Sequence, residues 1–171
     1  DVAWNDAGEK QEWRTLAETK TNFTGMQAIV PSGTNWQAGI KVGNSLLSSG
    51  RSDASKYVVF LTDGDPTFYY ATNGKTSGDG SDFEDKAYLY AKTEWNAVGS
   101  GVKKAKSYIV DATGKTNTNC TSFANDVGGT YLNGANSESL TKAFSKIAGD
   151  ITKPSYTNVS ITDTLSVYAD F

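Results

Sequence analysis

A short apolar run with a carboxylate directly behind it constrains the fold more than any other feature of this sequence. Tyr57-Val58-Val59-Phe60-Leu61 is rich in β-forming residues, and Thr62-Asp63-Gly64-Asp65 follows it at once. A continuous apolar run bounded by turn residues predicts a central strand over residues 56–62, buried on both faces. Ligands of open α/β sheets bind beyond the carboxyl ends of the strands, so the run also places Asp63 where a binding site is expected.

Short β-rich runs alternate with amphipathic stretches along the rest of the chain. This alternation predicts an α/β fold with a doubly wound, mostly parallel sheet. Further strands are predicted over residues 1–5, 107–110 and 129–132, and residues 63–81 are predicted to form a polar loop. Helices are predicted over residues 9–19, 22–30, 35–48, 82–98 and 116–127, with a last helix capped by Ser137 and ended by Pro154.

Composition narrows the classes of function. The 171 residues carry 37% hydrophobic residues, which is enough for one domain with a core, and a formal net charge of −3. Lys103, Lys104 and Lys106 form the densest basic cluster and are interpreted as a solvated helix end, so we expect no nucleic-acid partner. No apolar run approaches the length needed to cross a membrane. Histidine is absent, which excludes Ser-His-Asp catalysis and His-ligated zinc, and the single cysteine, Cys120, is predicted to be a small buried residue.

Two loops carry hard oxygen ligands of the kind that Mg²⁺ prefers. The turn Gly33-Thr34-Asn35-Trp36 offers the Thr34 hydroxyl, and the end of the apolar run offers the Asp63 carboxylate. These two segments and their spacing resemble the second and third motifs of a von Willebrand factor A-type domain, and the order of elements agrees over residues 1–152. The resemblance implies that Thr34 and Asp63 help hold a divalent cation, Mg²⁺ first and Mn²⁺ or Ca²⁺ as alternatives. It also implies that an acidic side chain of a partner completes the coordination.

The end of the chain extends the resemblance. Tyr156-Thr157-Asn158-Val159-Ser160-Ile161 resembles the entry to the β-domain that follows the A domain in pilus-tip adhesins of Gram-positive bacteria. This implies that residues 153–171 are a linker and the first strand of a β-sandwich. It implies a secreted, cell-wall protein at a pilus tip, with a host or extracellular-matrix ligand and other pilin subunits as partners. The family's first motif, Asp-x-Ser-x-Ser, is missing, so we expect a strand and a helix to precede Asp1, and we expect the 171 residues alone to be poorly stable.

The loop after Asp63 also carries three consecutive aromatic residues, Phe68, Tyr69 and Tyr70. Exposed aromatic side chains beside a binding site make good anchors for a partner. The other interpretation, of equal weight, is that they pack the loop onto the edge of the sheet.

Two alternatives to a metal-dependent adhesin remain open. The first is a structural pilin or spacer domain in which the metal site is degenerate. The second is an enzyme, because Asp63-Gly64-Asp65-Pro66-Thr67 matches the Asp-x-Asp-x-Thr loop of haloacid dehalogenase-like phosphotransferases, in which Asp63 would attack phosphorus and Asp65 would act as acid and base. Roughly sixty residues precede the motif, and no later pair of Asp residues completes that site, so we expect no enzymatic activity.

Overall fold

The computed structural model describes residues 15, 17 and 33–153, and their secondary structure is a mixture of helices and strands. In chain order the elements are α2 (Trp36–Ser49), β1 (Tyr57–Thr62), β2 (Tyr69–Tyr70), β3 (Thr76–Ser77), α3 (Asp85–Ala97), the 3-10 helix η2 (Val102–Lys104), β4 (Lys106–Asp111), α4 (Thr118–Val127), β5 (Thr130–Asn133) and α5 (Ser137–Thr152). The elements predicted over residues 1–5, 9–19 and 22–30, and the strand predicted at the C-terminus, lie outside this part of the chain, apart from the isolated residues 15 and 17.

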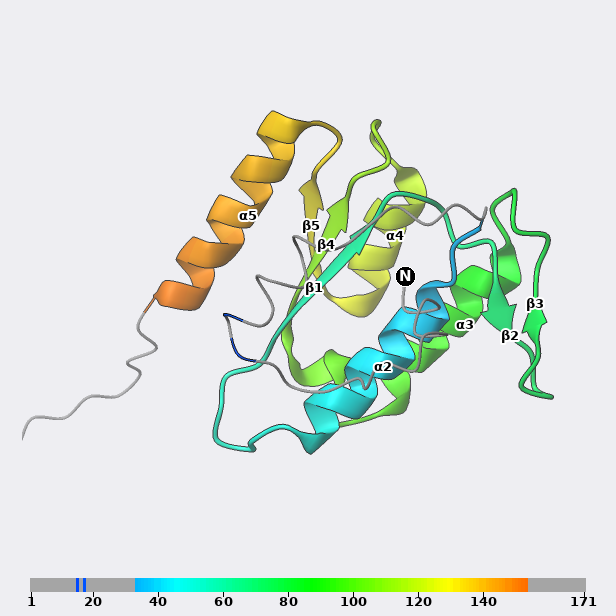
Figure 1. Ribbon diagram of the computed structural model, residues 1–171, viewed down its shortest axis with the longest axis horizontal. Helices are drawn as coiled ribbons and strands as arrows, with labels where there is room; N and C mark the ends of the chain where they lie inside the picture. Colours follow the sequence, from blue (N-terminus) through cyan, green and yellow to red (C-terminus); the bar gives the residue numbers. More distant parts are fainter. Residues whose placement is uncertain (1–14, 16, 18–32, 154–171) are drawn as a thin grey trace, which may run out of the picture.

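A three-stranded parallel sheet forms the centre of the described region (Figure 1). Its strand order is β1-β4-β5, with Tyr57 opposite Lys106 in the first pair and Tyr108 opposite Thr130 in the second. Helix α3 connects β1 to β4, and α4 connects β4 to β5, as parallel strands require. A separate antiparallel hairpin, β2 with β3, stands beside α2 and α3. The prediction of an α/β fold with a parallel sheet is confirmed for these elements.

Helix α2 shows how the sequence builds one face of this core. Asn35 caps the helix, because its side-chain oxygen accepts a hydrogen bond of 3.0 Å from the backbone N–H of Ala38. Trp36, Ile40 and Leu47 then recur at helical spacing and are buried against α3, α4 and the sheet. The helix predicted over residues 35–48 is therefore confirmed.

Aromatic rings fill the space between the sheet and these three helices. The ring of Phe123, on α4, lies 5.1 Å from that of Trp36 and 5.6 Å from that of Trp95, both in edge-to-face geometry. The rings of Phe60 and Tyr88 lie 5.7 Å from that of Phe123. Phe123 thus joins side chains of α2, α3 and β1 into one cluster, which is the centre of the hydrophobic core.

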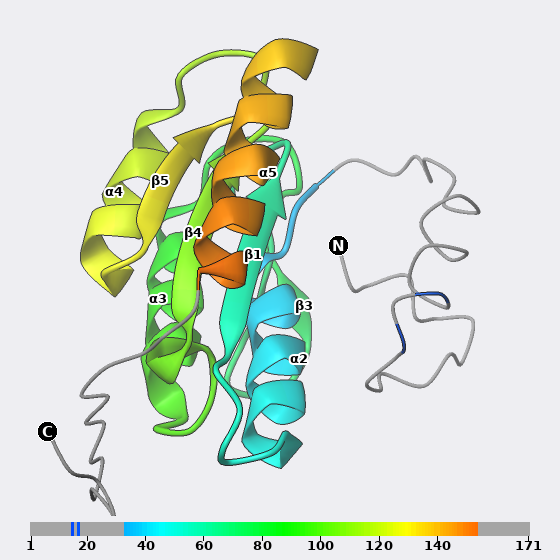
Figure 2. The same ribbon diagram turned by 90° about the vertical axis from the view of Figure 1, so that its left-hand side faces the viewer.

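Among the described elements, α5 is the one that covers the opposite face of the sheet (Figure 2). Ala143 and Ile147 are buried there against Tyr108 and Val110 of β4. The apolar face of α5 is only partly buried, because Phe144 and Ile151 are 43% and 47% exposed. The first helical residue is Ser137, and the cap is Asn136, so the prediction of Ser137 as the cap was wrong.

The prediction that the apolar run forms a central strand buried on both faces was also wrong for the sheet as described. Strand β1 lies at one edge, and Val59 and Leu61 are 39% and 47% exposed. Helix α5 packs mainly over β4 and β5, and no other described helix covers the same face of β1, so Val59 and Leu61 stay partly exposed. The loop predicted over residues 63–81 contains the hairpin, which the sequence analysis missed.

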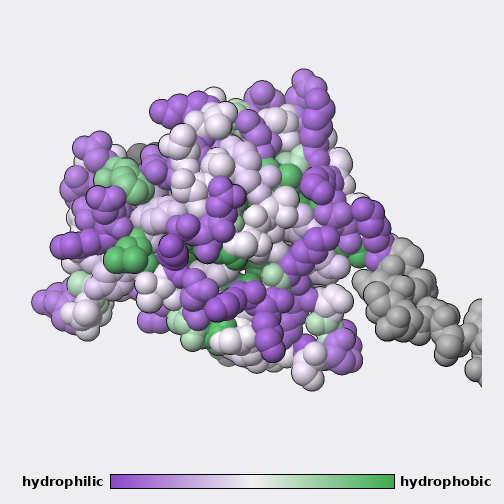
Figure 3. All heavy atoms as spheres, turned by 180° about the vertical axis from the view of Figure 1, so that it is seen from behind, coloured by the Kyte–Doolittle hydropathy of each residue, from purple (hydrophilic) through white to green (hydrophobic). Residues whose placement is uncertain are grey.

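The face of the molecule opposite to that in Figure 1 is mainly hydrophilic. Seen from behind, the molecule shows hydrophobic residues only in separate small patches (Figure 3). Lys103, Lys104 and Lys106 are exposed around the end of η2, as predicted. Within the described residues, no helix is both long and apolar enough to cross a bilayer.

Candidate functional site

The carboxyl end of β1 is fixed to the start of α2 by one tryptophan. The indole N–H of Trp36 donates to the hydroxyl oxygen of Thr62 at 3.0 Å and to the carbonyl oxygen of Gly64 at 3.1 Å. The Thr62 hydroxyl in turn donates to the Gly64 carbonyl at 2.7 Å. Because Trp36 and Thr62 are both buried, these bonds hold the turn after β1 in one place. Asp63 lies on this turn and is exposed to solvent.

The same turn brings Asp63 close to Thr34. The backbone N–H of Thr34 donates to the Thr67 hydroxyl at 2.7 Å, and the Thr34 carbonyl accepts from the N–H groups of Thr67 and Phe68. A Cβ added at Gly64 would lie 3.0 Å from the Thr34 hydroxyl oxygen, so a glycine there lets that hydroxyl approach the turn. Thr34 and Asp63 line one small cavity of about 70 Å³ at the sheet edge. The structure therefore brings the two predicted metal-ligating residues together, and their role as ligands stays a prediction.

The donors of this cavity fit a hard divalent cation only in part. A hydroxyl and a carboxylate are suitable oxygen ligands for Mg²⁺, but a protein site of this kind needs further donors or retained waters. Among the residues that the structure describes, no group of three or more His, Cys, Asp or Glu side chains could hold a metal ion.

Asp65, the second carboxylate of the turn, is held by the N-terminal end of α4. Its Oδ1 atom accepts hydrogen bonds from the side-chain amides of Asn117, at 2.8 Å, and Asn119, at 3.0 Å. Asn117 also caps α4, since its side-chain oxygen accepts from the backbone N–H groups of Asn119 and Cys120. Asp65 thus connects the turn after β1 to the start of α4, which is a structural role.

A buried carboxylate, Asp111, closes the adjacent strand β4, and the sequence analysis assigned it no role. Its Oδ1 accepts from the backbone N–H and the hydroxyl of Thr113, and its Oδ2 accepts from the N–H of Asn117 and the hydroxyl of Tyr131. Burial acts to raise the pKa of Asp111, but these four hydrogen bonds favour the charged form and leave its pKa below the usual range. The sequence does contain a signal for Asp111, because this residue directly follows a β-rich run, much as Asp63 follows the run that begins at Tyr57.

Two ionisable groups close to Asp111, the hydroxyl of Tyr131 and the thiol of Cys120, have raised pKa values. Burial raises the pKa of the Tyr131 hydroxyl to about 12, helped by its hydrogen bond to Asp111. Burial likewise raises the pKa of the Cys120 thiol to about 12, with the nearby charges of Asp111 and Asp65 adding to the effect. Cys120 is fully buried, which confirms the prediction of a small buried residue.

The three aromatic residues of the loop do not form one surface. A Cβ built at Gly33 or at Gly80 would collide with the ring of Phe68, which shows that this ring packs between the two glycines. The ring of Tyr69 stacks on that of Tyr90, with centroids 4.9 Å apart. Tyr70 lines a cavity that is separate from the one that contains Asp63. Phe68 and Tyr69 therefore support packing of the loop, whereas a binding role for Tyr70 stays open.

Comparison with known proteins identifies the fold. The sequence matches no protein-family model and no curated protein. Among solved structures, the chain is similar to the minor pilin PilB of Streptococcus sanguinis, with a TM-score of 0.62 and 22% sequence identity. The match covers 83% of this chain and 45% of the pilin, so the chain spans less than half the length of that protein. At this identity the similarity establishes that the two proteins share the fold of the matched region.

Proposed function

We propose that this chain is a structural domain of a pilin-type protein on the surface of a Gram-positive bacterium. The observation that carries the proposal is the similarity of fold to part of a streptococcal minor pilin. The site supports a structural role as well, because the carboxylates of Asp65 and Asp111 accept hydrogen bonds from other groups of the same chain. Other pilin subunits are then its first expected partners, and we expect no bond-making chemistry at Asp63 and Asp65.

Location and assembly test this proposal directly. Antibodies against the chain would be used on the encoding bacterium, with filaments sheared from the cells and separated from the cell bodies. We expect the protein in the sheared filament fraction and on filaments in immunogold electron micrographs. A strain lacking the main filament subunit is the control and should lose both signals. Detection only in the cytoplasmic fraction would rule the proposal out.

A specific observation favours metal-dependent adhesion as a second candidate function. The Thr34 hydroxyl and the Asp63 carboxylate line the same small cavity at the carboxyl end of β1, where an α/β sheet binds its ligands. The motifs around both residues resemble those of a von Willebrand factor A-type domain. In this candidate function, a cation held by Thr34 and Asp63 receives an acidic side chain of a host or extracellular-matrix protein. The protein would act at the cell wall or the pilus tip.

Titration with Mg²⁺ or Mn²⁺, followed by calorimetry and NMR, tests this second function. With two protein ligands we expect weak binding, with a dissociation constant on the order of millimolar. Asp63→Ala should abolish the binding and Thr34→Ala should weaken it, because each removes one oxygen donor. Asp53→Ala is the matched control, since Asp53 is an exposed carboxylate whose only described partner is Arg51 at 4.0 Å. Equal binding by Asp63→Ala and the unchanged protein would argue against the site.

A further inference from the structure

A second, larger cavity lies between α2, α3 and the β2–β3 hairpin. Its volume is about 630 Å³, which falls within the range of roughly 300–1,000 Å³ that is usual for small-molecule sites. Helix α2 contributes Gln37 and Lys41, the hairpin contributes Tyr70 and Thr72, and α3 contributes Tyr90. Lys41 and Thr72 are exposed, so the cavity opens to solvent beside them. It shares no lining residue with the cavity of Thr34 and Asp63.

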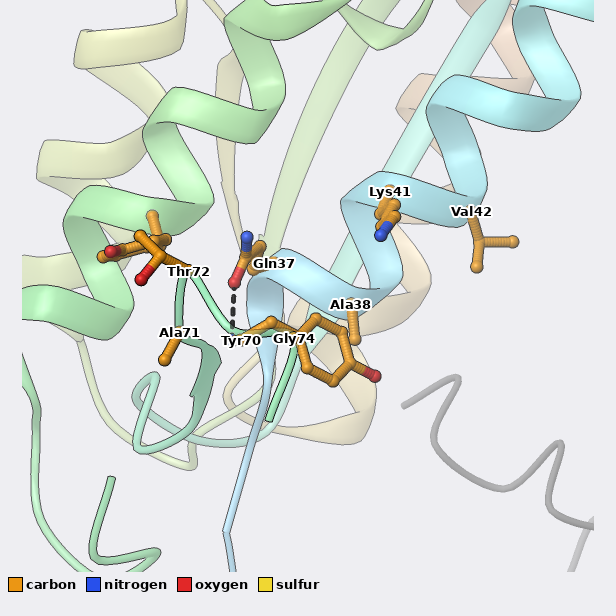
Figure 4. Close-up of a pocket in the computed structure, with 9 residues that line it drawn as sticks. Gln37, Ala38, Lys41, Val42, Tyr70, Ala71, Thr72 and Gly74 are labelled. Atoms are coloured by element: carbon orange, nitrogen blue, oxygen red, sulfur yellow. Dashed lines mark hydrogen bonds between the residues drawn. The ribbon is translucent and has the colours of Figure 1, made fainter. Parts of the chain in front are cut away.

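The hairpin wall of this cavity is held in position by hydrogen bonds. The backbone N–H of Tyr70 donates to the side-chain oxygen of Gln37 at 2.8 Å, which ties β2 to α2 (Figure 4). Within the turn, Ala71 N–H donates to the Lys75 carbonyl at 2.9 Å, and Gly74 N–H donates to the Ala71 carbonyl at 2.8 Å. These bonds fix the loop before any ligand arrives, and such preorganisation lowers the cost of binding.

The α3 wall is fixed by aromatic packing. The ring of Tyr90 stacks on that of Tyr69, with an angle of 29° between the two planes. Tyr70, the next residue, projects to the cavity side of the same strand, as alternation along a strand requires. The cavity therefore has two tyrosines: Tyr70 on the hairpin, whose backbone is bonded to Gln37, and Tyr90 on α3, whose ring is stacked on that of Tyr69.

The charge of the lining selects an anionic ligand. Among the described residues that line the cavity, Lys41 is the one that carries a charge, and none is Asp or Glu. Its ammonium nitrogen lies 5.8 Å from the centre of the Tyr70 ring, a distance at which the ring attracts a cation. This local positive charge occurs in a chain whose formal net charge is −3. A carboxylate is the group that an ammonium of this kind pairs with most simply.

The other polar groups suit a sugar. The Gln37 oxygen is used by Tyr70, but within the described residues the amide nitrogen makes no hydrogen bond and can donate to a ligand. The hydroxyls of Tyr70, Tyr90 and Thr72 likewise have no hydrogen-bond partner in the described part of the chain. A sugar ring offers many hydroxyls to such groups, and its C–H face packs against an aromatic ring.

A peptide fits this cavity less well. Peptides that bind beside a strand add their own strand to a free edge. One edge of β2 is paired with β3, and on the other side the N–H of Tyr70 is bonded to Gln37. The two-residue strand therefore lacks the free donor that strand addition at the cavity would require.

We propose that this cavity binds the terminal sugar of a glycan that carries a carboxylate. Lys41 pairs with the carboxylate, the ring of Tyr70 packs against the sugar, and Gln37 and Thr72 bond to its hydroxyls. The proposal concerns residues that play no part in the Thr34–Asp63 cavity, and it does not require the pilin function. It gives a surface protein a way to recognise acidic glycans without a metal ion.

Titration of the 171-residue chain with 3′-sialyllactose, followed by ligand-observed NMR and calorimetry, tests the proposal, with lactose as the neutral probe. We expect a dissociation constant on the order of millimolar for the acidic trisaccharide, and binding at least tenfold weaker for lactose. Lys41→Gln should weaken binding of the acidic sugar by about tenfold, because it removes the charge that pairs with the carboxylate. Lys75→Gln is the matched control, since Lys75 is an exposed lysine of the same hairpin that does not line the cavity.

Variants of Tyr70 separate binding from folding. Tyr70→Phe keeps the ring and should retain most of the affinity, whereas Tyr70→Ala should abolish binding, and circular dichroism must show that both variants are folded. EDTA should not reduce binding, which distinguishes this cavity from the metal-dependent candidate. The proposal is overturned if no binding is seen up to about 10 mM sugar. It is also overturned if lactose binds equally well, or if only an Asp/Glu-rich peptide binds.

Discussion

At the scale of single residues, buried polar groups decide how the sheet edge is built. Asp111 is fully buried and accepts four hydrogen bonds, from a backbone N–H and a hydroxyl of Thr113, the N–H of Asn117 and the hydroxyl of Tyr131. A buried charge is tolerated only when it is bonded in this way, since an unpaired one would cost several kcal/mol. Asp111 therefore holds the ends of β4 and β5 and the start of α4 together.

Replacement of Asp111 tests this role. Asp111→Asn keeps the shape of the side chain but removes its charge. The NH₂ group of the asparagine would also face one of the groups that donate a hydrogen bond to Asp111, so that hydrogen bond would be lost. We expect the free energy of unfolding to fall by about 2–3 kcal/mol at pH 7. Because the pKa of Asp111 is lowered in the folded protein, its contribution is present above the usual Asp pKa of about 3.9 and is lost as the pH falls through the folded-state pKa.

Urea unfolding of both proteins between neutral pH and about pH 3 provides the measurement. The difference in stability should be constant at neutral pH and should shrink below about pH 4. Asp53→Asn is the control, because Asp53 is exposed and its ion pair with Arg51 is of the kind that contributes little. A stability of Asp111→Asn equal to that of the unchanged protein would contradict the role assigned to Asp111.

At the scale of elements, the first residues of a helix decide where it begins, as α5 shows. The side-chain oxygen of Asn136 accepts from the N–H of Ser139 at 2.9 Å, and the Ser139 hydroxyl accepts from the N–H of Asn136 at 3.0 Å. This reciprocal pair is a capping box. With Ser137 as the cap, the reciprocating position would fall on Leu140, which has no polar side chain. The sequence therefore contained enough information to place this helix start, and the prediction of Ser137 overlooked it.

Alanine substitutions distinguish the two cap residues. Asn136→Ala should lower the free energy of unfolding by about 1 kcal/mol, because it leaves the N–H of Ser139 without its acceptor. Ser137→Ala should change it by no more than about 0.5 kcal/mol, because Ser137 is exposed within the first turn. The midpoint of urea unfolding measures both changes. A larger loss for Ser137→Ala than for Asn136→Ala would show that the cap is placed incorrectly.

At the scale of the whole molecule, the sequence predicts which segments form helices and strands better than it predicts which of these elements lie side by side. Periodicity predicted α2 and β4 and placed Asp63 at the end of a strand, because strand ends and helix starts follow from local pattern. The pairing of Asp63 with Thr34 came from the resemblance to von Willebrand factor A-type motifs, and the two residues line one cavity. The hairpin was missed because its strands have two residues each, too few for a period-2 pattern. The edge position of β1 was not predicted, because an apolar run shows only that its side chains prefer to be buried. In the described sheet no helix covers Val59 and Leu61, and both remain partly exposed.

The exposed edge of β1 combines apolar side chains with unpaired backbone groups. Lys106 N–H donates to the carbonyl of Lys56, and Ala112 N–H donates to that of Thr62, so even-numbered residues of β1 bond to β4. The backbone groups of Val59 and Leu61 therefore point away from β4, and no described strand pairs with them. An edge of this kind pairs readily with another chain.

We therefore expect the 171-residue chain to self-associate through β1 at high concentration. Leu61→Lys should weaken this association by about tenfold or more, because pairing would then bury a charge. Sedimentation velocity over a range of concentrations measures the effect. Leu89→Lys is the matched control, since Leu89 is 57% exposed and belongs to helix α3 rather than to β1. Equal loss of association in both variants would assign the effect to net charge, and a sedimentation coefficient independent of concentration in the unchanged protein would show that this edge is protected.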